Sequence, residues 1–351
     1  MTQTAILTPE RLRIPAVVSG RAPTVPTRHL LSILDLSADE VLYLCRRALR
    51  IKHAPSDPRT LRGRTVGVYF RKTSTRTRTG FMVGAGRLGA TTVYFGPNEL
   101  QTTTGETLED TARTLAGYLD VLVMRTNESV EEMRTFAAHP AMSVVNALSS
   151  DEHPTQALTD LTTLLEHFGR LEGLDVLYCG EGNRSAAALA LAMARIPGTR
   201  LTLATPAGYG LDASKLAAAR ELAARHGATI EEVDDVQAAP RGVDVVYTSR
   251  WQEMGVEKAD PAWKTHFRPF RVTPSLMERV SKPRGTVFMH DLPAVRGEDV
   301  DDAVLDGPQS LAWVQAQHKM FSAMSVMEWC GAGVVGDDGE DAAAPRGGRT
   351  P

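Results

Sequence analysis

The sequence is poor in cysteine, in excess charge of either sign and in long apolar runs. Its 351 residues include three cysteines, Cys45, Cys179 and Cys330, without disulfide-like pairing or metal-ligand spacing. The net charge of -3 lacks the basic excess that a nucleic-acid-binding face requires. We therefore expect no metal site, no nucleic-acid partner and reduced cysteines, with Cys45 packed in a hydrophobic core.

Segments that would direct the chain to a membrane are also missing. No apolar run approaches the length that spans a bilayer, and the N-terminus lacks the apolar region of a secretory signal. The 42% hydrophobic and 23% charged content is ordinary for a soluble protein, and the length suffices for two domains. We expect a cytoplasmic protein with no membrane partner.

Short apolar segments alternate with helical patterns along most of the chain. This alternation predicts α/β architecture, with parallel sheets covered on both faces by helices. Ser37 and Glu40 form a capping box that starts a helix predicted to end near Lys52. The predicted strands are 65–70, 90–95, 121–125, 143–147, 175–179, 200–204, 229–233, 243–248 and 286–290.

The stretch 74–78, Ser-Thr-Arg-Thr-Arg, follows the first predicted strand. A strand that turns into a helix through hydroxyl residues leaves unpaired backbone N–H groups, which favour a phosphate together with the helix dipole. Arg76 adds a planar charged fork that fits phosphate oxygens. In a purely structural alternative, Ser74 caps the helix and both Arg76 and Arg78 are solvated.

Three further motifs follow in the sequence. Arg125 ends a predicted strand, 153–156 reads His-Pro-Thr-Gln, and 290–293 reads His-Asp-Leu-Pro with Arg296 shortly after. In this order the motifs resemble those of the aspartate and ornithine carbamoyltransferase family. Its phosphate loop reads Ser-Thr-Arg-Thr-Arg, its second signature is His-Pro-x-Gln, and its late loop contains Leu-Pro. The resemblance covers about 30–329, nearly the whole chain.

The resemblance implies two doubly wound parallel-sheet domains linked by helices, with the active site in the cleft between them. It also implies a homotrimer in which the neighbouring subunit lends Gln101 or a nearby threonine to the site. The expected segments are an N-terminal arm (1–28), a carbamoyl-phosphate-binding domain (29–152), an acceptor domain (153–309), a C-terminal helix that returns to the first domain (310–330) and a disordered tail (331–351).

The resemblance implies transfer of a carbamoyl group from carbamoyl phosphate to an amine, with no cofactor. Such a transfer requires a phosphate clamp, a donor for the developing oxyanion and a neutral amine in line with the carbonyl carbon. By resemblance, Arg125 and His153 polarise the carbonyl oxygen and Gln156 holds the carbamoyl amide. In a purely structural alternative, His153 lies at a helix start and its ring forms hydrogen bonds only with backbone groups. The predicted carbamoyl-phosphate residues are Ser74, Thr75, Arg76, Thr77, Arg125, His153, Gln156, Leu292 and Arg296.

The acceptor side departs from the ornithine branch of the family. Ser249 stands in place of an aspartate, Glu253 in place of a serine and Asp291 in place of a cysteine. A carboxylate stabilises an ammonium, so Asp291 or the bound phosphate must accept the proton as attack begins. The predicted acceptor residues are Asn183, Arg184, Ser249, Arg250, Glu253, Met254, Asp291 and Leu292.

These substitutions favour an acceptor other than ornithine. We expect a diamino acid, free or within a larger metabolite, with its carboxylate on Arg184 or Arg250 and its cation near Glu253 or Asp291. Glu253 pointing to solvent is the competing interpretation. The alternative functions are an ornithine carbamoyltransferase that makes citrulline and a non-catalytic regulatory paralogue. The glycine pattern at 84–89 matches G-x-G-x-x-G, but it lies at the far end of a predicted helix and does not support dinucleotide binding.

Overall fold

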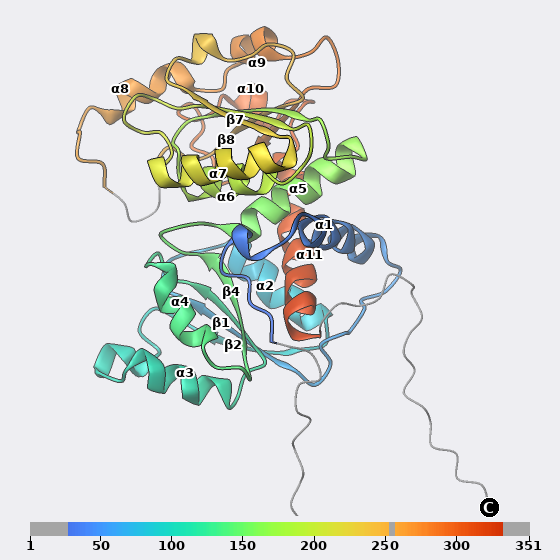
Figure 1. The fold of residues 1–351 in the computed structure, drawn as a ribbon, viewed down its shortest axis with the longest axis vertical. Coiled ribbons are helices and arrows are strands. Elements are labelled where there is room, and N and C mark those ends of the chain that lie inside the picture. Colours follow the sequence, from blue (N-terminus) through green and yellow to red (C-terminus); the bar gives the residue numbers. More distant parts are fainter. Residues whose placement is uncertain (1–26, 253–256, 333–351) are drawn as a thin grey trace, which may run out of the picture.

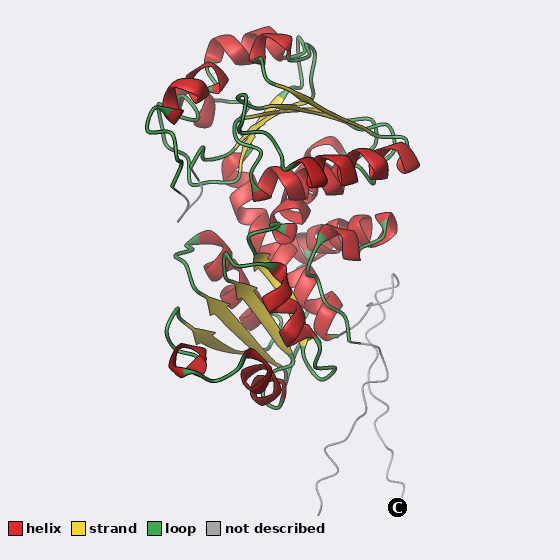
Figure 2. Ribbon diagram, turned by 60° about the vertical axis from the view of Figure 1, so that its left-hand side comes forward, coloured by secondary structure: helices red, strands yellow, loops and turns green. Residues whose placement is uncertain are grey.

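The computed structural model describes residues 27–252 and 257–332, which form two α/β halves with helices α5 and α11 between them (Figure 1). Each half contains its own sheet with helices packed on it (Figure 2). The elements up to the first long connecting helix are η2 (Ile33–Asp35), α1 (Ala38–His53), β1 (Thr65–Phe70), α2 (Arg76–Arg87), β2 (Thr91–Phe95), η3 (Gln101–Thr104), α3 (Leu108–Ala116), β3 (Val121–Arg125), α4 (Val130–Ala137), β4 (Ser143–Leu148) and α5 (Pro154–Phe168).

The second half continues from the end of α5, and its chain returns to the first half through α11. Its elements are β5 (Asp175–Cys179), α6 (Arg184–Met193), β6 (Arg200–Ala204), α7 (Ala213–His226), β7 (Thr229–Val233), η4 (Val236–Ala238), β8 (Val245–Thr248), α8 (Trp263–Phe267), η5 (Arg268–Phe270), α9 (Pro274–Val280), β9 (Val287–His290), α10 (Asp302–Leu305) and α11 (Ala312–Gly331).

Both sheets are parallel and doubly wound, as the sequence predicts. Their strand orders are β2-β1-β3-β4 and β7-β6-β5-β8-β9. The direction of winding therefore reverses between β1 and β3 in the first sheet and between β5 and β8 in the second. Ligands of open α/β sheets bind at the carboxyl ends of the strands that flank such a reversal. The topology thus places two potential binding edges on the molecule, one in each half.

The strand predictions hold to within two residues. The largest difference is at β8, which begins at Val245 rather than at residue 243. The first helix also begins as predicted, because the Ser37 hydroxyl accepts from the Glu40 N–H at 3.2 Å and the Glu40 carboxylate accepts from the Ser37 N–H at 2.9 Å. Buried strands and capped helix starts are local patterns, which explains their agreement with the structure.

Helix α11 packs against α1, α2 and α5, and so binds the chain's end to its first half. Glycines on α2 allow this close approach, because a Cβ on Gly84 would lie 2.8 Å from the Met324 side chain of α11. The pattern at 84–89 lies at the end of α2, where Gly84 serves helix packing and Gly89 adopts a positive φ of 82°, so it does not offer a helix start to a nucleotide phosphate. Cys45 is buried in the same core, as expected. Among the described residues, no helix is long and apolar enough to cross a membrane.

Candidate active site

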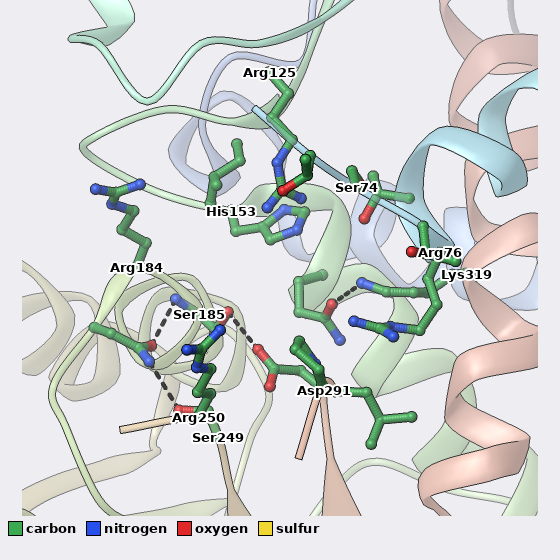
Figure 3. Close-up of a pocket in the computed structure, with 18 of the residues that line it drawn as sticks. Ser74, Arg76, Arg125, His153, Arg184, Ser185, Ser249, Arg250, Asp291 and Lys319 are labelled. Carbon is green, nitrogen blue, oxygen red and sulfur yellow. Dashed lines mark hydrogen bonds between the residues drawn. The ribbon is translucent and has the colours of Figure 1, made fainter. Parts of the chain in front are cut away.

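The strand ends of the two sheets face a shared cavity of about 200 Å³ between the halves (Figure 3). Side chains from the β1–α2 loop, β3, the start of α5 and α11 form one part of its wall, and loops after β5, β8 and β9 form the other. The lining residues are Thr73, Ser74, Thr75, Arg76, Thr77, Arg125, Leu148, His153, Gln156, Asn183, Arg184, Ser185, Ser249, Arg250, Gln252, Asp291, Leu292, Pro293 and Lys319.

The start of α2 forms the anion-binding end of this cavity. Thr75 is the N-cap residue and its side chain makes no capping hydrogen bond, while the Ser74 hydroxyl accepts from the Arg78 N–H at 3.3 Å. The first backbone N–H groups of this 12-residue helix therefore need another acceptor. Arg76 lines the cavity and its buried Nε has no hydrogen-bond partner within the described chain. Arg78 instead stacks on Tyr94 of β2, 5.3 Å from the ring centroid, and does not line the cavity.

An uncharged histidine lies among cations at the next part of the wall. His153 is buried at the N-cap of α5, and Arg125 is buried at the end of β3. Burial, with the charges of Lys319, Arg125 and Arg184, holds the pKa of His153 well below its usual value. The imidazole is thus neutral at physiological pH and can donate one hydrogen bond without carrying charge. Positive groups around a neutral donor favour a ligand that is anionic and carries a carbonyl oxygen.

Gln156 and Lys319 complete the first-half side of the site. The Gln156 amide nitrogen donates to Asp160 at 2.7 Å, and its oxygen accepts from the Lys319 ammonium. Burial lowers the pKa of Lys319 to about 8. The sequence analysis missed this lysine because it expected α11 only to return to the first half. The available signal was its spacing, since Gln315, Lys319 and Ser322 recur at helical intervals on a buried face.

Two predicted acceptor residues are already bonded to each other. The Asn183 side-chain oxygen accepts from the Ser185 N–H at 3.0 Å and so caps α6, while its nitrogen donates to the Ser249 hydroxyl at 2.8 Å. Ser249 is also 2.6 Å from the Tyr178 hydroxyl. These side chains shape the cavity wall, and the charged groups left at this part of the site are Arg184, Arg250 and Asp291, all of which line the cavity.

Asp291 is held at the end of β9 by its neighbours. Its carboxylate accepts a hydrogen bond from the Ser185 hydroxyl at 2.8 Å. Ser185 also lines the cavity and was not among the residues predicted from the sequence. The preceding His290 is fully buried, accepts from the Leu292 N–H at 2.8 Å and lies 3.2 Å from an Asp299 oxygen. The loop after β9 therefore presents Asp291 and Leu292 to the cavity in a fixed arrangement, as Figure 3 shows for Asp291.

The structure does not bring every predicted residue to the cavity. Arg296 was expected at the carbamoyl phosphate, but its exposed guanidinium instead binds Asp302 at 2.7 Å and Asp306 at 2.6 Å, so it is absent from the cavity wall. Gln101 lies exposed in η3 and likewise does not line this chain's cavity. Glu253 and Met254 lie outside the described residues.

Comparison with known proteins identifies the family. Residues 28–166 match the description "Aspartate/ornithine carbamoyltransferase, carbamoyl-P binding domain", and residues 172–330 match "Aspartate/ornithine carbamoyltransferase, Asp/Orn binding domain". The chain belongs to the aspartate/ornithine carbamoyltransferase family. As a member it is a carbamoyltransferase that depends on carbamoyl phosphate, and the resemblance inferred from its motifs is confirmed.

Relatives of this carbamoyltransferase cover almost its whole described length. The chain is 37% identical over 304 residues to a protein of Caldicellulosiruptor saccharolyticus named ornithine carbamoyltransferase, covering 86% of this chain and 97% of that one. It is 38% identical to a protein of the same name from Hyperthermus butylicus, and the match covers 86% of this chain and 96% of that protein. The solved ornithine carbamoyltransferase of Pyrococcus furiosus matches with a TM-score of 0.82 and 35% identity, covering 88% and 99%.

Proposed function

We propose that this carbamoyltransferase carbamoylates the side-chain amine of a diamino acid, and that ornithine is the first candidate. The observation that carries the proposal is the single cavity in which an uncapped helix start, Arg76, Arg125, neutral His153 and Gln156 meet Asp291. Relatives that are 37–38% identical and named ornithine carbamoyltransferase favour ornithine. The same names weigh against the expectation that ornithine is excluded.

On the donor side, the start of α2 binds the phosphate of carbamoyl phosphate together with Arg76. Lys319 adds a third positive group at the same part of the wall while it retains its proton. Arg125 and the imidazole N–H of His153 stabilise the charge that develops on the carbonyl oxygen, and Gln156 accepts from the carbamoyl NH₂. These contacts strengthen as the carbonyl oxygen gains charge, so they lower the barrier rather than only bind substrate.

On the acceptor side, the amine attacks as its neutral form. The new N–C bond forms as the C–O bond to phosphate breaks, and phosphate leaves with the bonding electrons. The attacking nitrogen must lose one proton, which passes to Asp291 or to the departing phosphate. Arg184 and Arg250 line the same cavity and suit the acceptor's α-carboxylate.

A second candidate is a diamino acid of another chain length, free or part of a larger metabolite. The observation in its favour is the Asp291–Ser185 pair at 2.8 Å inside the cavity, where a carboxylate can hold an acceptor cation. Asn183 and Ser249 are bonded to each other, so the α-amino group needs a partner elsewhere.

A panel assay decides between the two candidates. Purified enzyme is given carbamoyl phosphate with ornithine, lysine, aspartate, putrescine, 2,4-diaminobutyrate or 2,3-diaminopropionate, and ureido products are read by mass. The highest kcat/KM with ornithine supports the first candidate, whereas a shorter diamino acid with inert ornithine supports the second. Phosphate release without any ureido product contradicts both.

We further propose a homotrimer whose neighbouring subunit supplies Gln101, acting in the cytoplasm. Gln101 is exposed in η3 and absent from its own cavity wall, a placement that suits a contribution to another copy of the chain. The buried free thiols of Cys45, Cys179 and Cys330 suit a reducing compartment.

A further inference from the structure

Asp160 is a buried carboxylate beneath the cavity that no step of the proposed reaction uses. It is fully buried on α5 and is absent from the cavity wall. One of its oxygens accepts from the amide nitrogens of Gln156 and Gln315, both at 2.7 Å, and the other accepts from the Tyr247 hydroxyl at 2.9 Å. A buried carboxylate is costly unless its hydrogen bonds are satisfied, so three donors from α5, α11 and β8 hold it firmly.

The carboxylate dictates how both amides are turned. The nitrogens of both amides lie 2.7 Å from one Asp160 oxygen. Burial raises the pKa of Asp160 to about 7, so above that pH the carboxylate is ionised and only accepts hydrogen bonds, and Gln156 and Gln315 must each point their NH₂ group at it. The oxygen of Gln156 then faces Lys319 and the cavity. The oxygen of Gln315 faces β9 and accepts from the backbone N–H of His290 at 3.0 Å. His290 is the residue that precedes Asp291 in the sequence.

We propose that Asp160 is a positioning residue. It fixes Gln156, which binds the carbamoyl donor, and Asp291, which faces the acceptor, relative to each other. It holds the Gln156 oxygen toward the carbamoyl NH₂ and, through Gln315, holds the end of β9 that carries Asp291. The inference rests on the proposed function, because it assumes that Gln156 reads a carbamoyl amide.

Orientation matters here because the amide of Gln156 has a donor end and an acceptor end. If the side chain turned over, its NH₂ would face the carbamoyl NH₂ and the Lys319 ammonium, and the hydrogen bonds to both would be lost. Misplacement of the Asp291 loop would likewise take the attacking amine out of line with the carbonyl carbon. A carboxylate that served only helix packing would affect neither of these alignments.

The test uses two stable probes that differ in their amide. Phosphonoacetamide carries a phosphonate and a carbamoyl-like amide, whereas methylphosphonate carries the phosphonate alone. The ratio of their Kd values, measured by calorimetry on the full chain, separates the contribution of the amide to affinity from that of the anionic group. It needs no turnover and no knowledge of the acceptor.

The variant is Asp160→Asn, and the matched control is Thr162→Val on the same helix. Thr162 is buried and lies 3.2 Å from Ser322 of α11, so its replacement also removes a polar contact between α5 and α11. In the wild type we expect phosphonoacetamide to bind about tenfold more tightly than methylphosphonate. Asp160→Asn should reduce this preference about threefold or more, since Arg125 and His153 still bind the carbonyl oxygen of the amide. Methylphosphonate affinity should stay within about twofold of wild type, and Thr162→Val should retain the preference.

Other results separate the two proposals. A wild type without preference for phosphonoacetamide contradicts the proposed role of Gln156, and with it the proposed function. A normal wild-type preference that persists in Asp160→Asn overturns the positioning role alone. Equal loss in Thr162→Val also overturns it, because any disturbance of α5 against α11 would then suffice.

Gln315→Met tests the acceptor arm and remains available if Asp160→Asn does not fold. The thioether keeps the length of the side chain, is only a weak acceptor for the His290 N–H and has no N–H to donate to Asp160. We expect it to retain the amide preference while raising the KM for the acceptor and lowering kcat by about tenfold. Unchanged acceptor kinetics would overturn the link from Asp160 to Asp291.

Discussion

At the scale of single residues, the site is defined by which groups can change charge. Arg76 and Arg125 are permanently cationic, and His153 is held neutral by burial and by the cations around it. Lys319 differs from the permanently charged arginines and from the neutral histidine, because burial lowers its pKa to about 8 and it can lose its proton near physiological pH. The strength of the anion site should therefore depend on pH through this one lysine.

Replacing Lys319 with arginine should remove that dependence. The pKa of Lys319 is lowered to about 8, so the side chain is cationic below that pH and neutral above it. In the wild type the KM for carbamoyl phosphate should rise by about tenfold between pH 7 and pH 9.5 as the charge is lost. The Lys319→Arg enzyme keeps its charge and should show a nearly flat profile, measured by initial rates at saturating acceptor. Coincident profiles would show that another group titrates.

At the scale of elements, several groups that line the cavity lie at the starts of helices. Helix α2 offers uncapped N–H groups and α5 begins directly after His153. Helix α6 is capped by Asn183, and its first two residues, Arg184 and Ser185, line the cavity. The turn before α5 is fixed by Glu152, whose carboxylate accepts from the Ser32 hydroxyl at 2.6 Å and the Ile33 N–H at 2.8 Å. These anchors make the positions of catalytic side chains depend on short connecting turns.

Glu152→Gln should change how stability responds to pH. Burial raises the pKa of Glu152 from 4.5 to about 7, so the folded state binds more protons than the unfolded state between those values. Its contribution to stability is full below about pH 4.5 and is lost as pH rises through 7. The variant should therefore gain stability relative to wild type by about 2 to 3 kcal/mol between pH 4.5 and pH 8. Urea unfolding across this range measures the difference, and a constant difference would contradict the prediction.

Gly182→Ala should destabilise the β5–α6 turn. A Cβ at this position would lie 2.2 Å from the Leu211 nitrogen and 2.3 Å from the Gly210 carbonyl carbon, and backbone cannot move aside as a flexible side chain can. We expect a loss of about 1 to 3 kcal/mol in the free energy of unfolding. The control is Gly86→Ala within α2, where a Cβ meets nothing within 4 Å and helix propensity predicts a gain of about 0.5 to 1 kcal/mol. Similar effects of both changes would rule out this steric explanation.

At the scale of the whole molecule, α5 and α11 determine the site because they pack between the two sheets. Through them the carboxyl-end edges of both sheets face one cavity, and a ligand there contacts both halves at once. A ligand bound there displaces water, which would otherwise compete with the amine for the carbamoyl group. A further subunit completes it in our proposal, since Gln101 lies outside its own cavity.

Mixed oligomers test that proposal. Arg76→Ala removes the phosphate fork and Gln101→Ala removes the residue offered to a neighbour, so each homogeneous enzyme should lose activity by about tenfold or more. If sites are shared, co-expressed chains form some sites in which both residues are native. The mixture, isolated by two affinity tags, should then exceed the activity of either parent several-fold. Activity equal to the parental average would show that each site takes Arg76 and Gln101 from the same chain, and a monomeric mass by light scattering would exclude sharing.

The strands, the capped helix starts, the family and most of the residues that line the cavity could be predicted from the sequence. These follow from local patterns: buried runs, hydroxyls before helices, and motifs at a strand end such as Arg125 or at a helix start such as His153. The tertiary structure decided which distant groups meet. It placed Lys319 at the cavity and Arg296 on surface carboxylates, although both are basic residues near the end of the chain.

The same distinction explains the acceptor side and the groups beneath the site. Gln156 and Asp160 are one helical turn apart on α5, but the bonds from Asn183 to Ser249 and from Gln315 to Asp160 join residues whose separations no local pattern encodes. Sequence spacing limits which side chains share one face of one element. Whether two elements meet depends on packing of their buried faces, and only that packing sets the few ångströms that make a hydrogen bond.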